Sequence, residues 1–200
     1  MARRQDHSPQ ELQALVVQHV LSCLQSQPVN TLSLRQIARD VGYSPGTLIN
    51  QFGSYNLLLL AVNAATLDRL YQTLHDAMSK APDHRGALSA AALRYLQFAR
   101  DQPHAWRLVF ELRLTDEEPL PAWQDLRIGA LFALLENRLA GLKSGARTDD
   151  CREAARVLWA GVQGICQLTL DNKLFIHDNS NGELLIASLM NHYLTSWVSS

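Results

Sequence analysis

The chain has 200 residues, of which 47% are hydrophobic and 18% are charged, and its formal net charge is −1. This composition is too apolar for a disordered chain and supports one or two packed cores. The near-zero net charge excludes a protein coated with basic side chains, although a local basic patch stays compatible with it.

No apolar run approaches the roughly 18 to 20 residues that a membrane-spanning helix needs, and no apolar segment follows the two N-terminal arginines as in a signal peptide. We therefore expect a cytoplasmic protein with no membrane partner. Cys23, Cys151 and Cys166 are widely spaced in apolar stretches. This pattern indicates reduced core thiols and predicts neither a disulfide framework nor a metal site.

Apolar residues recur at spacings of three and four along the whole chain, which predicts an all-α fold of about nine helices. The first helix begins after Ser8, since Ser8, Pro9 and Glu11 supply an N-cap, a first-turn proline and a capping box.

A second and a third helix are predicted close together. Ser33 and Gln36 form another capping box before a helix of about two turns. Gly42 can supply the positive φ of a tight turn, and Ser44 and Pro45 then start the third helix. This order of elements is typical of a helix-turn-helix.

The later elements are longer. We expect helices, in chain order, over about 55–78, 88–95, 103–110, 122–142, 155–169 and 186–197, with a loop at 114–121.

The third helix has two unlike faces. On a wheel of 100° per residue, Pro45, Leu48 and Phe52 lie together and are expected to pack on the second helix. The opposite stripe is uncharged but rich in hydrogen-bonding groups: Ser44, Thr47, Asn50 and Gln51. Asn and Gln can pair with adenine in the major groove, and the Thr methyl can meet a thymine methyl, so this stripe is a candidate for reading base edges.

Other residues nearby suit contacts with the DNA backbone. Gly46 leaves no side chain at the start of the third helix, where free N–H groups and the positive end of the dipole favour phosphate. Arg35 and Arg39, together with Arg3 and Arg4 of an N-terminal arm, are available for phosphate or minor-groove contacts.

Residues from about 8 to 62 resemble the DNA-binding domain of the TetR family of bacterial transcriptional regulators. The motifs that match are Ser33-x-x-x-Ile37-Ala38, Val41-Gly42-Tyr43-Ser44-x-Gly46-Thr47-Leu48, and Phe52 followed by Leu57 and Leu58. The resemblance implies a helix-turn-helix domain at 1–54 and a helical effector-binding and dimerisation domain at 55–200. It also implies a ligand-responsive repressor that binds a palindromic double-stranded DNA operator as a homodimer.

Two positions depart from the family pattern. Ile49 stands where the family usually has Tyr, and Tyr55 stands where it usually has Lys. Both usual residues touch phosphates, so we expect weaker non-specific binding and a shallower salt dependence. The residues expected at the DNA surface are Arg3, Arg4, Ser33, Arg35, Tyr43, Ser44, Pro45, Gly46, Thr47, Ile49, Asn50, Gln51 and Tyr55.

The C-terminal part is loosely similar to a subgroup with a Trp-His-Gly signature, except that Gln163 replaces the His. The residues that could line an effector pocket, or equally form plain core, are Tyr95, Phe98, Trp106, Phe110, Trp159 and Gln163. The residues that could form a dimer interface, or complete the core of one chain, are Gly161, Gly164, Leu189, Tyr193 and Trp197.

An alternative function is a helical DNA-binding protein that recruits a protein partner without a small-molecule effector. An enzyme is not expected, because no catalytic residues are apparent: there is no nucleophile with a base, no paired carboxylates and no phosphate-binding loop. No cofactor is expected.

Overall fold

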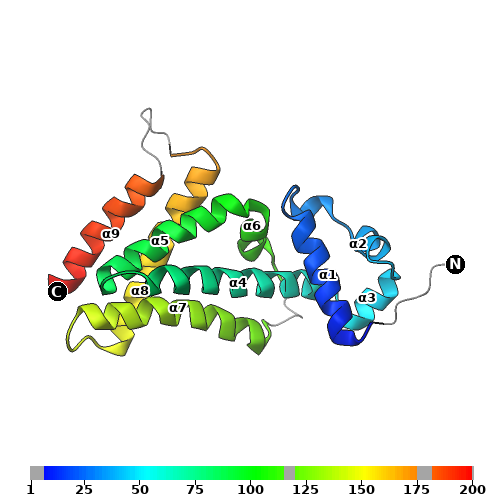
Figure 1. Cartoon of the computed structure of the whole chain (residues 1–200), viewed down its shortest axis with the longest axis horizontal. Helices are drawn as coiled ribbons and strands as arrows, with labels where there is room; N and C mark the ends of the chain where they lie inside the picture. Colours follow the sequence, from blue (N-terminus) through cyan, green and yellow to red (C-terminus); the bar gives the residue numbers. More distant parts are fainter. Residues whose placement is uncertain (1–6, 115–119, 175–181, 200) are drawn as a thin grey trace. The chain divides into compact units, whose positions relative to one another are not determined.

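A computed structural model describes residues 7–114, 120–174 and 182–199 (Figure 1). Over these residues the fold is all-α with nine α-helices, as predicted. The elements are α1 (Pro9–Cys23), a 3₁₀ turn η1 (Val29–Thr31), α2 (Leu34–Asp40), α3 (Pro45–Phe52), α4 (Tyr55–Ser79), α5 (His84–Asp101), α6 (Pro103–Glu111), α7 (Ala122–Leu142), α8 (Thr148–Leu170) and α9 (Gly182–Ser199). None of the described helices is both long and apolar enough to span a membrane.

The predicted helix starts depend on side-chain caps. The Ser8 hydroxyl accepts from the Glu11 N–H at 3.3 Å, and the Glu11 carboxylate accepts from the Ser8 N–H at 2.8 Å, which completes the capping box. The Ser33 hydroxyl accepts from the Gln36 N–H at 3.2 Å. The reciprocal bond from the Gln36 side chain is not formed among the described contacts, so Ser33 is a simple N-cap.

The backbone contacts divide the chain into two compact units, described separately below. The first unit comprises the described residues within 1–67 and 104–124, and the second comprises those within 68–103 and 125–200. Residues 55–67 of α4 therefore belong to the first unit, and residues 68–79 belong to the second. Helix α6, which the predicted division at 54/55 assigns to the C-terminal part, belongs to the first unit.

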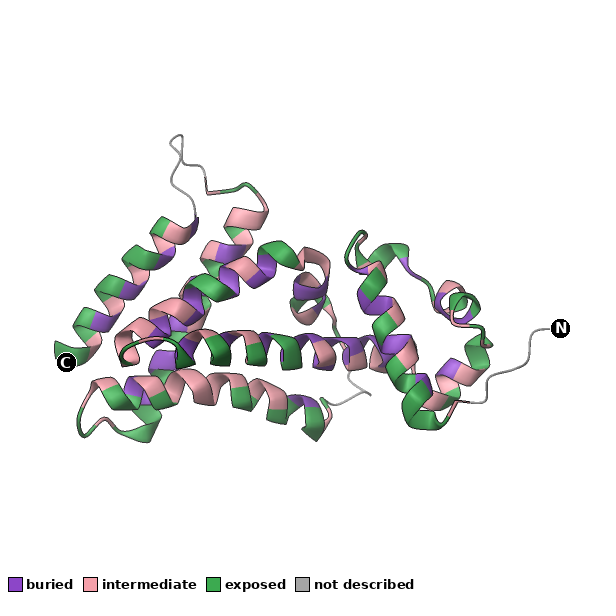
Figure 2. Ribbon diagram, viewed as in Figure 1, coloured by how far each residue is buried: buried purple, intermediate pink, exposed green. Residues whose placement is uncertain are grey.

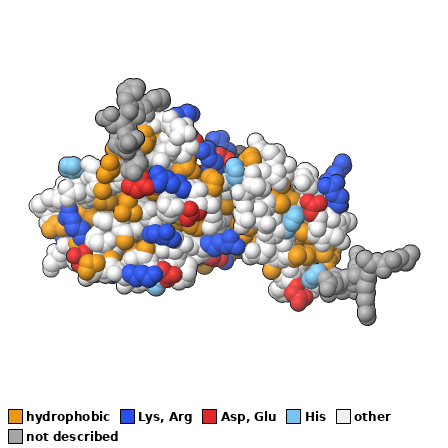
Figure 3. Space-filling model, turned by 45° about the horizontal axis from the view of Figure 1, so that its top comes forward, with side chains coloured by type: hydrophobic (Ala, Val, Ile, Leu, Met, Phe, Trp, Pro, Cys, Tyr) orange, Lys and Arg blue, Asp and Glu red, His pale blue; other side chains and the backbone are white. Residues whose placement is uncertain are grey.

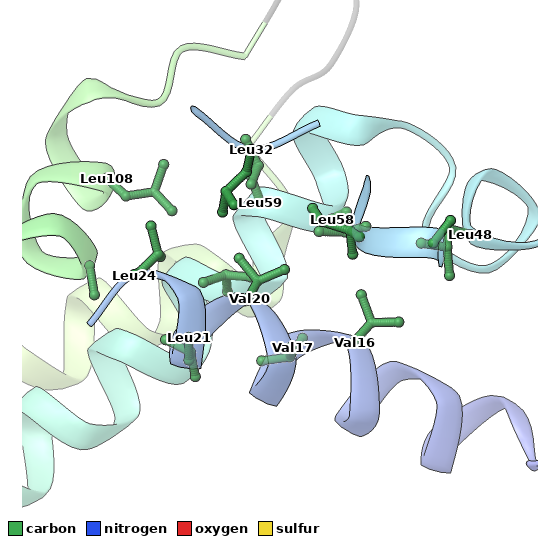
Figure 4. Packing of buried hydrophobic residues seen from close by; sticks show 14 of the residues in the cluster. Val16, Val17, Val20, Leu21, Leu24, Leu32, Leu48, Leu58, Leu59 and Leu108 are labelled. Carbon is green, nitrogen blue, oxygen red and sulfur yellow. The ribbon is translucent and has the colours of Figure 1, made fainter. Parts of the chain in front are cut away.

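The core of the first unit is a cluster of aliphatic side chains from several helices (Figure 4). Val16 of α1 lies on the side of Leu48 of α3 and Leu58 of α4, whereas Leu24, the C-cap of α1, lies near Leu108 of α6, and all of these side chains are buried. Helix α6 contributes two buried residues, Ala105 and Leu108. The short helices α2 and α3 are thus fixed to a core larger than the three N-terminal helices could make alone.

In the second unit, α5 and α9 pack in antiparallel directions and both contact α8. Arg100 near the end of α5 pairs with Glu183 at the start of α9. At the opposite end, the Arg85 guanidinium donates to the Asn191 side chain at 3.0 Å and to the Thr195 hydroxyl at 2.9 Å. Buried and exposed positions alternate around these helices, as expected for amphipathic packing (Figure 2).

Candidate nucleic-acid interface

The turn between α2 and α3 is a Schellman motif centred on Gly42. Gly42 has φ +81°, its N–H donates to the Arg39 carbonyl at 3.1 Å, and the Tyr43 N–H donates to the Ala38 carbonyl at 2.8 Å. A residue with a Cβ would be strained at this φ. The predicted positive φ is confirmed, and it lets α3 start only a few residues after α2 ends.

The N-terminus of α3 is capped but open. The Ser44 hydroxyl accepts from the Thr47 N–H at 3.0 Å and lies 2.9 Å from the Thr47 hydroxyl. Pro45 occupies the first turn and is exposed. A methyl group on Gly46 would meet nothing nearer than the Ser44 hydroxyl oxygen at 3.7 Å. Packing inside the protein therefore does not require a glycine here, and the space remains free for an approaching molecule.

The two faces of α3 differ in burial. Leu48 is fully buried and Phe52 is half-buried against the core of the first unit, whereas Pro45, which we expected to pack beside them, faces solvent. On the opposite face, Ser44 and Asn50 are exposed, and Thr47 and Gln51 are half-buried. The uncharged polar stripe is thus accessible along the whole helix.

Tyr55 and Ile49, both expected at the DNA surface, are partly enclosed by the protein. The Tyr55 hydroxyl donates to the Leu32 carbonyl at 3.2 Å, and burial raises the pKa of Tyr55. The hydroxyl that could have met a phosphate is therefore engaged inside the protein. Ile49 is half-buried.

Basic side chains near α3 are few. Arg35 is exposed, and the Arg39 side chain is 76% exposed with its Nε 3.5 Å from the Asp40 carboxylate. Ser33 is exposed but used as a cap. Arg3 and Arg4 lie outside the described residues. On the face shown in Figure 3, basic side chains are scattered among acidic ones rather than gathered into one patch.

The sequence did not predict the polar contacts that two histidines make in the first unit. His7 Nδ1 lies 2.7 Å from the hydroxyl of Tyr43, a contact across 36 positions that no local pattern predicts. His19 Nε2 lies 3.7 Å from Cys23 Sγ and 3.6 Å from the Asp40 carboxylate. The spacing of four between His19 and Cys23 on one helix was the available signal. No group of three His, Cys, Asp or Glu side chains in the described part of the chain could hold a metal ion.

The residues considered for an effector pocket are divided between the units. Trp106 is buried and Phe110 is 41% exposed in the first unit, where their rings meet edge to face at 5.2 Å. The other four belong to the second unit: Tyr95 and Phe98 are buried, and Trp159 and Gln163 are half-buried. The Tyr95 hydroxyl donates to the Gln163 side-chain oxygen, so this polar side chain finds its partner within the protein.

The residues considered for a dimer interface also have contacts within the chain. A methyl group on Gly161 would lie 2.8 Å from Leu189 Cδ2, so these two residues pack α8 against α9. The Trp197 indole N–H donates to the Leu139 carbonyl at 3.2 Å. Tyr193 is half-buried, and burial raises its pKa. Gly164 is exposed, with nothing within 4 Å of a methyl group placed on it. Its side of α8 is therefore open.

Comparison with known proteins agrees with this geometry. Residues 88–192 match the family described as "Tetracyclin repressor-like, C-terminal domain". The HTH-type transcriptional regulator BetI of Rhizobium meliloti (strain 1021) is 28% identical over 155 residues, covering 75% of this chain and 73% of that protein.

Solved structures share the fold over nearly the full length. A protein of unknown function from Rhodococcus sp. RHA1 has a TM-score of 0.78 at 21% identity, covering 99% of this chain and 100% of that one. A TetR-family transcriptional regulator from Streptomyces coelicolor has a TM-score of 0.65 at 20% identity, covering 92% and 98%. Because the family match spans more than half of a chain that also carries an N-terminal helix-turn-helix, the protein belongs to the TetR family of transcriptional regulators, which bind DNA and are not enzymes.

Proposed function

We propose that this protein is a ligand-responsive repressor that binds a palindromic operator as a homodimer. The observation that carries the proposal is the accessible, uncharged polar stripe of α3, opposite the buried Leu48. In a helix-turn-helix the second helix enters the major groove, and its N-terminal residues meet base edges. Thr47, Asn50 and Gln51 then read the operator, and two copies of α3 occupy successive major grooves about 34 Å apart.

The double replacement Thr47→Ala and Asn50→Ala tests the reading face. The measurement is the ratio of affinities for the protein's own upstream DNA and for a scrambled duplex of equal length, at one stated salt concentration. Each lost base contact lowers the preference by about 1–3 kcal/mol, so the ratio falls by about 30-fold or more. Replacing the exposed Gln25 of the same unit by Ala should leave the ratio unchanged. An unchanged ratio in the double variant would show that another surface reads the operator.

We further propose that the homodimer forms through the outward faces of α8 and α9. Val157 and Leu168 on α8 and Leu184 and Val198 on α9 are between 42% and 60% exposed. The α8 pair lies on the same face as the open Gly164, and the α9 pair is likewise aligned at helical spacing. Two such faces related by a two-fold axis bury their apolar side chains against each other.

Mass in solution at micromolar concentration tests the dimer. The dimer has about 45 kDa, twice the chain mass of 22.4 kDa. Leu168→Glu should yield the monomer, because a carboxylate cannot be buried in an apolar interface without a partner. Leu93→Glu, at an exposed leucine on α5, is the matched control and should stay dimeric. A wild-type mass of one chain would remove the dimer from the proposal.

The proposed effector acts on the second unit and signals to the first through α4, since this helix supplies residues to both units. Thermal stability against a panel of metabolites distinguishes this mechanism from recruitment of a protein partner. A ligand at 100 times its dissociation constant adds about 2.7 kcal/mol to the unfolding free energy. A ligand that stabilises the protein and also lowers its DNA affinity supports the repressor. If no metabolite stabilises the protein while a protein partner binds it, the alternative is favoured.

A further inference from the structure

One side of α8 combines polar and aromatic side chains within the second unit. Arg156, Trp159 and Gln163 follow one another at spacings of three and four, so they lie on the same side of the helix. Two of them meet α7: the rings of Trp159 and Phe132 are edge to face at 5.6 Å, and Arg156 Nη1 donates to the Glu136 carboxylate at 2.8 Å. We call this the Trp159 side of α8. It is separate from the proposed dimer face, which lies on another side of the same helix.

The aromatic rings on this side are only partly covered. Phe132 and Trp159 are both half-buried. The guanidinium carbon of Arg156 lies 4.5 Å from the centre of the Phe132 ring, but the Arg156 side chain itself is 51% exposed. Two large rings that the described residues leave partly uncovered offer a surface on which a flat apolar group can pack.

The Arg156 guanidinium uses only one of its nitrogens within the protein. Nη1 donates to the Glu136 carboxylate and to the Arg152 carbonyl, both at 2.8 Å. Nε and Nη2 have no hydrogen-bond partner among the described residues. These two nitrogens form one edge of the planar guanidinium, and such an edge matches the two oxygens of a carboxylate.

Gln163 supplies a second donor on the same side of α8. Its side-chain oxygen accepts from the hydroxyl of the buried Tyr95 on α5, which fixes the orientation of the amide. In the described part of the chain the amide nitrogen has no partner, and it is not fully enclosed. Seven residues of helix separate Gln163 from Arg156, which is about 10 Å along the axis, and Trp159 lies between them.

We propose that the Trp159 side of α8 binds a small aromatic carboxylate. The carboxylate accepts from Nε and Nη2 of Arg156, the ring packs against Trp159, and a second acceptor such as a carbonyl oxygen meets the Gln163 amide. This inference rests on the proposed function, because it names the chemical class of the effector. An organic cation fits less well, because the Arg156 guanidinium already occupies the position over Phe132 and beside Glu136.

Calorimetric titration of the full chain without DNA tests the site. The probes are 3-phenylpropionate and 3-phenylpropionamide, which have the same shape and differ in charge. Wild type should bind the carboxylate with a dissociation constant of about 1 mM or below, and the amide about tenfold more weakly or worse. Arg156→Gln should weaken binding of the carboxylate about tenfold or more, because it removes the bidentate, charged donor.

Two further variants of this ion pair and its neighbour sharpen the test. Glu136→Gln should strengthen binding of the carboxylate about two- to fivefold, because no internal carboxylate then competes for the guanidinium. A misfolded variant could not produce this gain. Arg152→Gln is the matched control: Arg152 lies one turn earlier, is exposed and pairs with Asp149 at 3.3 Å. Its affinity for the probe should equal that of the wild type.

A third probe, 3-(4-acetylphenyl)propionate, adds a carbonyl oxygen for Gln163. It should bind wild type about three- to tenfold more tightly than 3-phenylpropionate. Gln163→Glu keeps an oxygen for the Tyr95 hydroxyl but removes the amide donor, so this gain should disappear in the variant.

Three results would overturn the proposal: no binding of either carboxylate by wild type, equal binding of the carboxylate and the amide, or equal affinities in Arg156→Gln and Arg152→Gln. Failure of the proposed function is a separate result. A wild-type chain that binds the carboxylates as expected but binds no duplex would refute the repressor and leave this site in place.

Discussion

Two glycines three residues apart on α8 allow a matched test of how α8 and α9 pack. In a helix interior, Gly→Ala stabilises by about 0.8–1.0 kcal/mol if the new methyl group finds room. A methyl group on Gly164 meets nothing within 4 Å. Gly164→Ala should therefore gain about 1 kcal/mol, which raises the Tm of a chain of this size by roughly 2–4 °C.

The same change at Gly161 should not stabilise. A methyl group there would lie 2.8 Å from Leu189 Cδ2 and 3.5 Å from Cδ1, so the leucine side chain must move. Overpacking of this kind costs about 1–3 kcal/mol, which cancels or exceeds the gain in helix propensity. Gly161→Ala should thus be between neutral and about 2 kcal/mol less stable than wild type.

Urea unfolding monitored by tryptophan fluorescence and circular dichroism gives the unfolding free energies of the Gly164→Ala and Gly161→Ala variants. It is run at several protein concentrations, because subunit association also contributes to stability. If Gly164 lies in the proposed dimer face, its variant should lose part of its advantage as concentration rises. Equal unfolding midpoints for the two variants at low concentration would refute the close packing of Gly161 on Leu189.

Three further experiments test the core of the first unit, the burial of a cysteine and an ion pair in the second unit. Leu48→Ala, at a fully buried position in α3, should destabilise the first unit by about 2–5 kcal/mol in chemical unfolding. The Cys166 thiol, whose pKa burial raises to about 12, should resist iodoacetamide at pH 8 in the native protein and react after unfolding, as followed by mass spectrometry. The hydrogen bond from Arg100 holds the pKa of Glu183 below its ordinary value of 4.5. The ion pair therefore stabilises the fold fully above pH 4.5, and this stabilisation disappears as the pH falls through the lower pKa of the folded state. Glu183→Gln should therefore flatten the loss of stability in that acid range, and an unchanged pH profile would contradict the reasoning.

Local chemistry explains why so much of the N-terminal architecture was predictable. The caps at Ser8, Ser33 and Ser44 and the turn at Gly42 depend on residues at most a few positions apart, and the structure has all of them. The predicted helix at 122–142 likewise matches α7.

Contacts between distant residues were not predictable. Tyr55 donates to a carbonyl 23 positions away, and Tyr95 pairs with a side chain 68 positions away. From the sequence, Gly161 was compatible with close packing against another subunit as well as against α9, because a glycine indicates close packing but does not identify the neighbouring element. The DNA-contacting set, the effector site and the dimer face therefore stay predictions, whereas the family and the fold are established.

The completion of the N-terminal core by α4 and α6 limits how this protein can be rebuilt. A fragment ending at residue 54 would lack Leu58 and Leu59 of α4 as well as Ala105 and Leu108 of α6, all of which belong to that core. A chimera that joins the first unit to the effector domain of another protein would have to include two segments of this chain, which are separated by more than thirty residues in the sequence. The first unit therefore cannot be exchanged by cutting the chain once. Recombination at the predicted boundary between residues 54 and 55 would expose apolar core surface on both products.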